Sequence, residues 1–314
     1  MKKVVLVLLL IASLFAFAGC SSSNQINDDA APQALEFRRA DDYTLSGKRN
    51  GLILYGAAIL ENSVLICDMG NSCLREFDFQ GNEIKSVGRL GNGNGEFIRP
   101  SGLTYCNERF YVVDSGNSRI QILDINLDYQ GEYELDKLDE STAYTYYTDI
   151  AACENGVVTV LTNSVQKESA RVYISNSNGS VQKMPFVING YTNCKKDRIY
   201  YTNTFELFEN NSSYDAITQE STLYEFVNNE LRDIFKFPYK YGPTDFIVDG
   251  DDVYVLSCVW SQLDHFKTDG SYLETIWRFD SLSPESFLVR TPQEDFVVTD
   301  GLNNVAYFLS RKSN

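Results

Sequence analysis

The amino-acid sequence predicts an all-β protein, a β-propeller of six four-stranded blades. Of its 314 residues, 43% are hydrophobic, and 20 Tyr and 19 Phe accompany 7 Pro, which is the composition of one large globular domain. Beyond the N-terminal segment, no stretch of about 12 residues repeats apolar side chains at helical spacing. Short alternating runs bounded by Gly, Asn and Asp recur instead, and this pattern is typical of strands joined by tight turns.

The clearest repeating unit runs from Gly88 to Asp124. Within it we expect two short apolar strands, at 102–105 and 110–113, and a third of alternating isoleucines at 120–125. The segment from Asp114 to Asn117 predicts a tight turn between the second and third strands. Asp and Asn side chains bond their own backbone there, and Gly and Asn tolerate a positive φ.

This unit resembles an NHL repeat, the blade unit of a family of β-propellers. It has the Gly-rich entry, Phe97, Pro100 and the run Val-Asp-Ser-x-Asn-x-Arg-Ile at 113–120. The turn recurs more loosely at Asp68 to Asn71, with Cys73 where the unit above has an arginine, and again at Asp300 to Asn303. The resemblance, to NHL-like and TolB-like propellers and to six-bladed propeller lipoproteins of bacteria, implies an architecture without naming a ligand.

The repeat period gives the number of blades. The ends of the second strands are marked by Asp68, Asp114, Thr162, Asn203, Ser257 and Asp300. Successive marks lie 41 to 54 residues apart, and a domain from residue 34 to residue 314 allows about 47 residues for each of six blades, which suits four strands. The sequence therefore predicts six blades.

The sixth blade leaves little chain after its third strand, expected at 305–309. We expect an N-terminal segment, either 43–46 or 35–39, to supply its missing outer strand. Such a strand closes the ring and removes the exposed edge that an open sheet must otherwise protect.

The N-terminus has the pattern of a bacterial lipoprotein leader. Lys2 and Lys3 precede an uncharged, mostly apolar run at 4–19, which is shorter than the roughly 20 residues of a membrane-spanning helix. Residues 17–20, Phe-Ala-Gly-Cys, resemble a lipobox, and this resemblance implies cleavage after residue 19 and lipidation of Cys20. The alternative is an uncleaved anchor helix.

Three regions follow from this pattern. We expect a signal peptide at 1–19, a lipidated cysteine and flexible tether at 20–33, and the propeller at 34–314. The tether is rich in Ser, Asn and Asp, a composition that cannot bury a core. The protein is then expected at the bacterial cell envelope, lipid-anchored and facing either the periplasm or the surface, with the anchor as its contact with the membrane.

The charge balance argues against a nucleic-acid partner. The chain carries 27 Lys and Arg against 43 Asp and Glu, a net charge of −16. Such a surface repels phosphate backbones at low salt. The acidic residues are dispersed rather than grouped in blocks, which favours a solvated acidic surface over an acidic docking patch.

Six cysteines remain after Cys20. Cys106, Cys153 and Cys194 each end a first strand, so they occupy equivalent positions on successive blades. We expect such positions to lie farther apart than the Cα separation of about 7 Å that a disulfide tolerates. Buried free thiols are therefore expected, with Cys67 and Cys73, which flank one turn, as the alternative pair.

Loops at one face of a propeller carry its function on a rigid scaffold. The connections between second and third strands and between successive blades open on the same face, around the mouth of the central channel. The predicted ligand-binding residues there are Arg49, Asn94, Arg99, Tyr147, Tyr241 and Trp260. An aromatic rim with Arg and Asn suits a sugar, a peptide or a small amphipathic ligand, although the tyrosines have the alternative role of packing between blades.

For the long segment 205–222 in blade four we consider two roles, a lid over this mouth or a mobile surface loop.

Two function classes remain. The first is a lipid-anchored binding or protein-interaction propeller with a small-molecule, glycan or protein ligand. The second is an enzyme that resembles the calcium-dependent propeller lactonases or the propeller lyases with histidine-bound zinc. One histidine, His265, cannot supply such a zinc site, and the Glu, two Asn and Asp of the lactonases find no match here. We therefore predict a binding module with no catalytic residues, no metal site and no cofactor.

Overall fold

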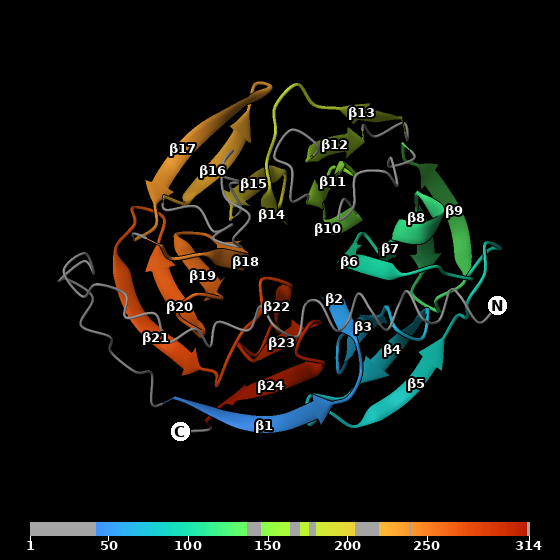
Figure 1. The fold of residues 1–314 in the computed structure, drawn as a ribbon, viewed down its shortest axis with the longest axis horizontal. Helices are drawn as coiled ribbons and strands as arrows, with labels where there is room; N and C mark the ends of the chain where they lie inside the picture. The colour runs from blue at the N-terminus through green and yellow to red at the C-terminus, as the bar shows by residue number, and fades with distance from the viewer. Residues whose placement is uncertain are drawn as a thin grey trace, which may run out of the picture.

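The computed structural model describes residues 42–136, 146–163, 170–175, 180–204, 220–238 and 240–312. These residues form six sheets, each of four antiparallel strands, arranged like blades around a central axis (Figure 1). The prediction of an all-β, six-bladed propeller is confirmed. Within the described ranges the one helical element is a single 3-10 turn, Ser115–Asn117.

The strands follow one another from the axis outward in each blade, except in the last. Blade one contains β2 (Leu54–Ile59), β3 (Val64–Asp68), β4 (Cys73–Phe77) and β5 (Glu83–Val87), and blade two contains β6 (Pro100–Cys106), β7 (Arg109–Asp114), β8 (Arg119–Asp124) and β9 (Tyr129–Glu134). Blade three contains β10 (Tyr146–Ala152), β11 (Val158–Asn163), β12 (Arg171–Ser175) and β13 (Val181–Lys183), and blade four contains β14 (Gly190–Lys195), β15 (Arg198–Asn203), β16 (Thr222–Val227) and β17 (Glu230–Lys236). Blade five contains β18 (Pro243–Asp249), β19 (Asp252–Ser257), β20 (Gln262–Lys267) and β21 (Tyr272–Arg278), and blade six contains β22 (Ser286–Arg290), β23 (Phe296–Asp300), β24 (Val305–Arg311) and β1 (Tyr43–Asn50).

Blade six is completed from the other end of the chain. Strand β1 pairs antiparallel with β24, so that Leu45 lies opposite Leu309 and Asn50 opposite Val305. The two strands run side by side in Figure 1. Closure by the segment that starts at Tyr43 is therefore confirmed, whereas the alternative segment 35–39 lies outside the described residues.

Burial explains why strands of one blade differ in pattern. The second strands β3 and β23 are buried at every position, because neighbouring blades cover both faces of the inner part of a sheet. They accordingly have continuous apolar runs. The outer strand β9 alternates half-buried and exposed residues, because one of its faces meets solvent.

The aspartates that end second strands hold the turns that follow them through hydrogen bonds. The Asp114 carboxylate is fully buried and accepts hydrogen bonds from Ile98 N at 2.7 Å, Asn117 Nδ2 at 2.7 Å and Arg119 Nε at 2.9 Å. It thus joins the loop after β7 to the connection that enters the blade. Asp300 binds Asn303 Nδ2 at 2.7 Å in the same way. The Asp-x-x-Asn signature marks a turn of the scaffold.

The cysteines correct one prediction. Cys153 and Cys194 form a disulfide between blades three and four, with their Cα atoms 5.5 Å apart. The expected separation was wrong because first strands converge on the axis, where neighbouring blades are closest. Cys67, Cys73 and Cys106 are free thiols, so the alternative pair is not formed.

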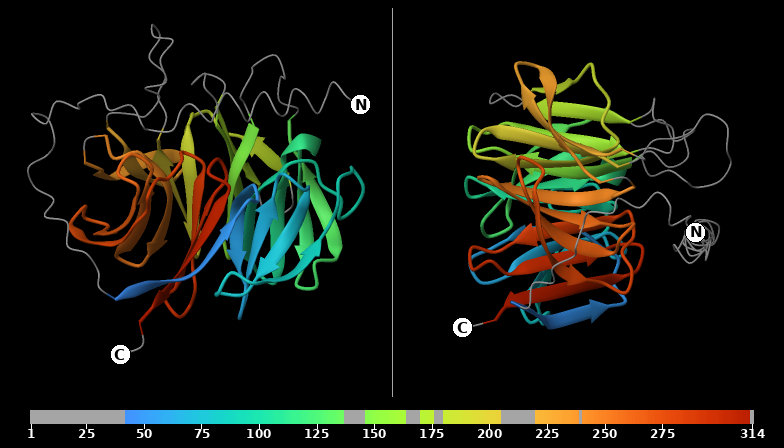
Figure 2. Two further views of the ribbon diagram at one scale, coloured as in Figure 1. Left: turned by 60° about the horizontal axis from the view of Figure 1, so that its bottom comes forward. Right: turned by 90° about the vertical axis from the view of Figure 1, so that its left-hand side faces the viewer.

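The propeller has two faces. The front face, toward the viewer in Figure 1, carries connections between second and third strands and between blades, such as 88–99, 258–261 and 301–304. The back face carries turns between first and second strands, such as 107–108, 250–251 and 291–295, and the end of β24 (Figure 2). No helix among the described residues is long and apolar enough to cross a membrane. The predicted leader, Cys20 and the tether lie outside those residues.

Candidate functional site

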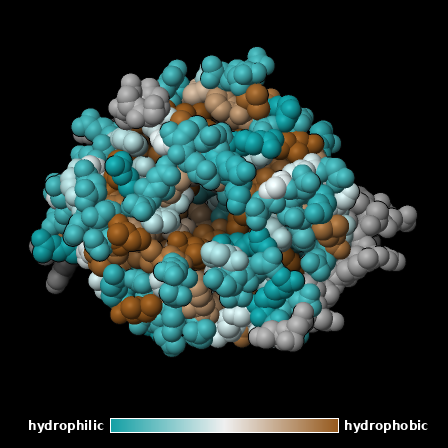
Figure 3. Space-filling model, turned by 180° about the vertical axis from the view of Figure 1, so that it is seen from behind, coloured by the Kyte–Doolittle hydropathy of each residue, from teal (hydrophilic) through white to brown (hydrophobic). Residues whose placement is uncertain are grey.

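The six first strands surround the central channel, which contains a pocket of about 90 Å3. Each of these strands contributes to its lining, through Gly56, Leu103, Asp149, Thr192, Asp245 and Leu288 among others. The back face is hollowed at its centre (Figure 3). A small pocket that opens backward therefore lies on the propeller axis.

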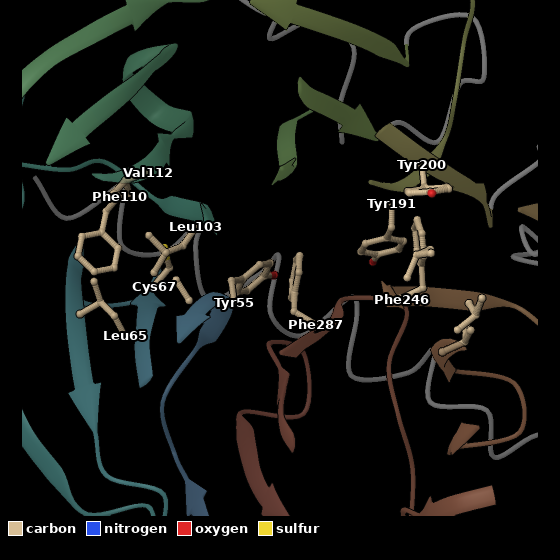
Figure 4. Packing of buried hydrophobic residues seen from close by; sticks show 14 of the residues in the cluster. Tyr55, Leu65, Cys67, Leu103, Phe110, Val112, Tyr191, Tyr200, Phe246 and Phe287 are labelled. Carbon is tan, nitrogen blue, oxygen red and sulfur yellow. The ribbon is translucent and has the colours of Figure 1, made fainter. Parts of the chain in front are cut away.

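Three aromatic rings lie beside one another at the front end of the channel. Tyr55, Tyr191 and Phe287 are each the second residue of their strands, β2, β14 and β22, and are almost fully buried. The Phe287 ring centroid lies 5.7 Å from that of Tyr55 and 5.8 Å from that of Tyr191 (Figure 4). First strands run from front to back, and the pocket is lined mostly by residues that follow these rings. The rings therefore lie on the front side of the pocket.

Two aspartates line the pocket. Asp149 accepts backbone hydrogen bonds from Ile150 and from Thr192 in blade four, both at 2.8 Å. Burial raises the pKa of Asp149 to about 7, although both N–H bonds act to lower it. Each carboxylate oxygen is already held by a backbone donor, so this group joins neighbouring blades.

Asp245 repeats the arrangement between blades five and six. It accepts hydrogen bonds from Phe246 N and Leu288 N, both at 2.7 Å. Burial, and then the charge of Asp149, raise the pKa of Asp245 well above its usual range. Two carboxyl groups in one small pocket disfavour each other's ionised form.

An aromatic stack lies in blade five toward the front. Tyr241 is fully buried, and its ring stacks on Phe237 with centroids 5.1 Å apart. The Trp260 ring meets Tyr241 edge-on at 5.0 Å. The Tyr241 hydroxyl donates to Asp264 at 2.7 Å, and burial raises the pKa of Asp264 to about 6 against the lowering effect of its hydrogen bonds. Trp260, which is half-buried, therefore rests on a rigid support.

Sequence reasoning missed Asp149, Asp245 and Asp264. The available signal was an acidic residue beside a short apolar run within a strand, as at Asp245 before Phe246 and Ile247. Such residues are rarely buried without a partner, so each of them indicated an internal hydrogen-bonding role.

The predicted aromatic residues differ in accessibility. Tyr147 and Tyr241 have no exposed surface, in keeping with the alternative role of packing between blades. The Tyr147 hydroxyl donates to the Asp136 carbonyl oxygen at 2.5 Å, and its ring packs against Tyr173. The structure brings Tyr241 and Trp260 together, and Trp260 alone of the three offers surface to a ligand.

The predicted polar residues lie in two different parts of the propeller. Asn94 and Arg99 are exposed in the connection 88–99 on the front face. Arg49 does not lie at the channel mouth, which corrects its predicted place. It belongs to β1, the outermost strand of blade six, where it pairs with Glu83 at 3.6 Å and lies over the Phe77 ring. Its position follows from ring closure, which sets β1 at the rim.

The part of the chain that the structure describes contains one histidine, His265, among many Asp and Glu side chains. No group of three or more His, Cys, Asp or Glu side chains there is arranged to hold a metal ion. His265 Nε2 lies 2.7 Å from Asp252 Oδ1, and Lys267 binds the same carboxylate. Residues 205–219 of the long blade-four segment are outside the described residues.

The chain is thus a six-bladed β-propeller, and comparison with known proteins adds one family signature. The NHL repeat model matches residues 97–123, inside the unit that the sequence singled out. No curated protein matches.

Solved structures share the fold at low sequence identity. A gluconolactonase of Xanthomonas campestris aligns with a TM-score of 0.59 at 14% identity, covering 90% of this chain and 94% of its own. Regucalcin of Agrobacterium tumefaciens, a calcium-binding protein, aligns with a TM-score of 0.58 at 11% identity, with coverage of 87% and 95%. A streptogramin B lyase aligns with a TM-score of 0.54 at 11% identity, with coverage of 86% and 98%. At these identities the likeness establishes the fold alone.

Proposed function

We propose that this chain is a binding propeller of the bacterial envelope, tethered through a lipidated Cys20, that engages a glycan, peptide or protein at its front face. The observation that carries the proposal is the packing of the Trp260 ring against the Tyr241 ring, which itself stacks on Phe237. We call these three rings the front-face ledge. Trp, Tyr and Arg anchors dominate binding energies where they are rigid and partly exposed. Asn94 and Arg99 add exposed polar groups on the same face.

The position of the channel carboxyl groups supports binding over catalysis at the front face. The titratable groups of the channel pocket, Asp149 and Asp245, lie behind the ring of Tyr55, Tyr191 and Phe287, and backbone N–H groups hold both. A general acid or base must lie within hydrogen-bonding reach of its substrate. A ligand at the front face therefore meets an aromatic and polar surface rather than these carboxyl groups.

The alternative is a calcium-dependent, lactonase-like hydrolase. Its support is the shared fold with the gluconolactonase and with the calcium-binding regucalcin. Lactone hydrolysis by the purified protein in the presence of calcium, together with a calcium-dependent rise in melting temperature, would favour this alternative and contradict the binding proposal.

The test of binding uses the two tryptophans of the chain. The purified protein is applied to glycan and peptide arrays, and the ligand found is titrated against Trp260→Ala and Trp277→Ala. Trp277 is also half-buried but lies in the outer strand β21, so it controls for loss of a large ring. We expect Trp260→Ala to lose about 2 kcal/mol of binding and Trp277→Ala to bind normally. Equal binding by both variants would refute the proposed site.

The tether needs its own test. Cys20→Ala should move the protein from the membrane fraction to the soluble fraction, because a lipidated cysteine is the proposed anchor. A variant that stays in the membrane with residues 1–19 attached would indicate an anchor helix instead.

A further inference from the structure

A second pocket, with a volume of about 400 Å3, lies at the back face between blades four and five. One side is formed by Arg198 and Tyr200 of β15 and by Arg232 and Asp233 of β17. The other side comes from blade five, at the turn 250–251 and at Thr268. It shares no lining residue with the channel pocket, so it is a separate site.

Two guanidinium groups are fixed on one wall. Glu225 of β16 is 3% exposed and accepts hydrogen bonds from Arg198 Nε and Arg232 Nη2. Arg232 is its cross-strand partner, and the Arg198 guanidinium lies over the Tyr200 ring, 5.4 Å from the centroid. The two arginine side chains nevertheless remain 58% and 64% exposed. Arginines held this way present oriented donors to a carboxylate without further ordering.

The guanidinium pair keeps its charge in this setting. Burial acts to raise the pKa of Glu225, but the hydrogen bond and charge of Arg198, joined by those of Arg232, lower it on balance. Glu225 is therefore ionised at neutral pH and balances one of the two guanidinium charges. One positive charge remains for a ligand.

Acidic groups also line the pocket. Asp233 and Asp251 are both part of its lining. A simple anion would be attracted by the arginines and repelled by these carboxylates, and a simple cation would meet the reverse. Tyr200 is 3% exposed, and Arg198 lies over its ring, so this side chain offers little aromatic surface to a sugar ring. A ligand that carries both charges complements the whole lining.

We propose that this pocket binds a small zwitterionic ligand, with its carboxylate against Arg198 and Arg232 and its ammonium group against Asp233 and Asp251. This is the chemistry of a free amino acid and of a short peptide with free termini. A pocket of about 400 Å3 has room for either, since small-ligand pockets begin at about 300 Å3. The site is additional to the front-face ledge and does not depend on it.

The experiment compares ligands that have both charged groups with analogues in which either the ammonium group or the carboxylate is blocked. Alanine, dialanine, N-acetylalanine and alaninamide are titrated into the purified protein by calorimetry at low salt. We expect alanine or dialanine to bind, and each blocked analogue to bind about tenfold more weakly, because one wall is left without its ion pair. A preference between alanine and dialanine distinguishes the two sources. Equal binding of N-acetylalanine would indicate a plain anion site and overturn the proposal, as would no binding at about 10 mM ligand.

Variants locate the binding. Arg232→Gln and Asp251→Asn should each weaken binding about tenfold. Lys236→Gln is the matched control, since Lys236 is an exposed cation of the same strand, paired with Glu220 outside the pocket. Asp251 lies in an exposed turn, so its substitution answers the question even if Arg232→Gln disturbs Glu225. Unchanged affinity in Asp251→Asn, or an equal loss in Lys236→Gln, would contradict the assignment.

Discussion

Removing the disulfide between Cys153 and Cys194 should weaken the propeller far more than removing any free thiol. The bond joins the ends of the first strands of blades three and four, beside the central channel. In the double variant Cys153→Ala/Cys194→Ala, the native strands β10 and β14 keep their other contacts. The variant lacks the covalent bond in its unfolded chain, and this is the state in which the bond restricts conformational freedom most.

The sequence separation sets the magnitude. The bond spans 41 residues, and the loop-entropy relation then gives about 4 kcal/mol of stabilisation at 25 °C. Domains typically have a total unfolding free energy of about 5–15 kcal/mol. The expected loss is therefore a large fraction of the whole, and it should be visible without any change in the folded structure.

Urea unfolding of the purified protein measures this loss. We expect the midpoint to fall in the double variant and, to a similar extent, in the wild type under reducing conditions. Cys106→Ala is the matched control, because Cys106 ends the first strand of blade two and is a free thiol. The slope should also rise in the double variant, since an uncrosslinked unfolded chain exposes more surface. A double variant within about 1 kcal/mol of the wild type would refute the reasoning.

Three further outcomes are expected. The pKa of Asp149 rises from 3.8 to about 7 on folding, so its burial lowers the stability of the wild type progressively as pH rises between these values. The unfolding free energy of Asp149→Asn, relative to that of the wild type, should therefore increase by up to about 4 kcal/mol between pH 4 and pH 8. A difference in melting temperature that does not change with pH would contradict this. Deleting the chain through Gly47 removes most of β1 and uncovers β24, so the truncated protein should aggregate or melt well below the full chain; an unchanged melting curve would mean that β1 does not stabilise the ring. Arg119→Ala should lose about 3 kcal/mol by leaving the buried Asp114 carboxylate without its cation, whereas Arg89→Ala, whose side chain is 80% exposed, should lose less than about 1 kcal/mol in the same denaturation assay.

The architecture was predictable from local chemistry. Asp68, Asp114 and Asp300 end second strands because each caps its own turn, and a cap of this kind is specified by residues three positions apart. The spacing of such marks counts the blades even where the signature is lost, as at Thr162. Ring closure followed from a blade that lacked a strand and from an alternating segment beginning at Tyr43.

The site was less predictable because it depends on distances across the axis. Nothing local separates Cys106, which is free, from Cys153, which is paired with Cys194. Tyr147 and Tyr241 have the residue type of a binding rim, yet both are buried. The Tyr147 hydroxyl binds the Asp136 carbonyl oxygen in the connection after β9, and the Tyr241 hydroxyl binds the buried Asp264 of β20. Residue type alone does not distinguish a buried tyrosine with a bonded hydroxyl from an exposed one.

The inner strands also support placing both proposed sites at the two faces and not in the channel. Around the axis, Asp149 binds the next blade through Thr192 N, and Asp245 does so through Leu288 N, while Cys153 is bonded to Cys194. These polar groups of the channel are thus already used to hold blade to blade. Partly exposed side chains, such as Trp260 in front and the arginine pair behind, lie farther from the axis, where a change of side chain leaves the ring intact.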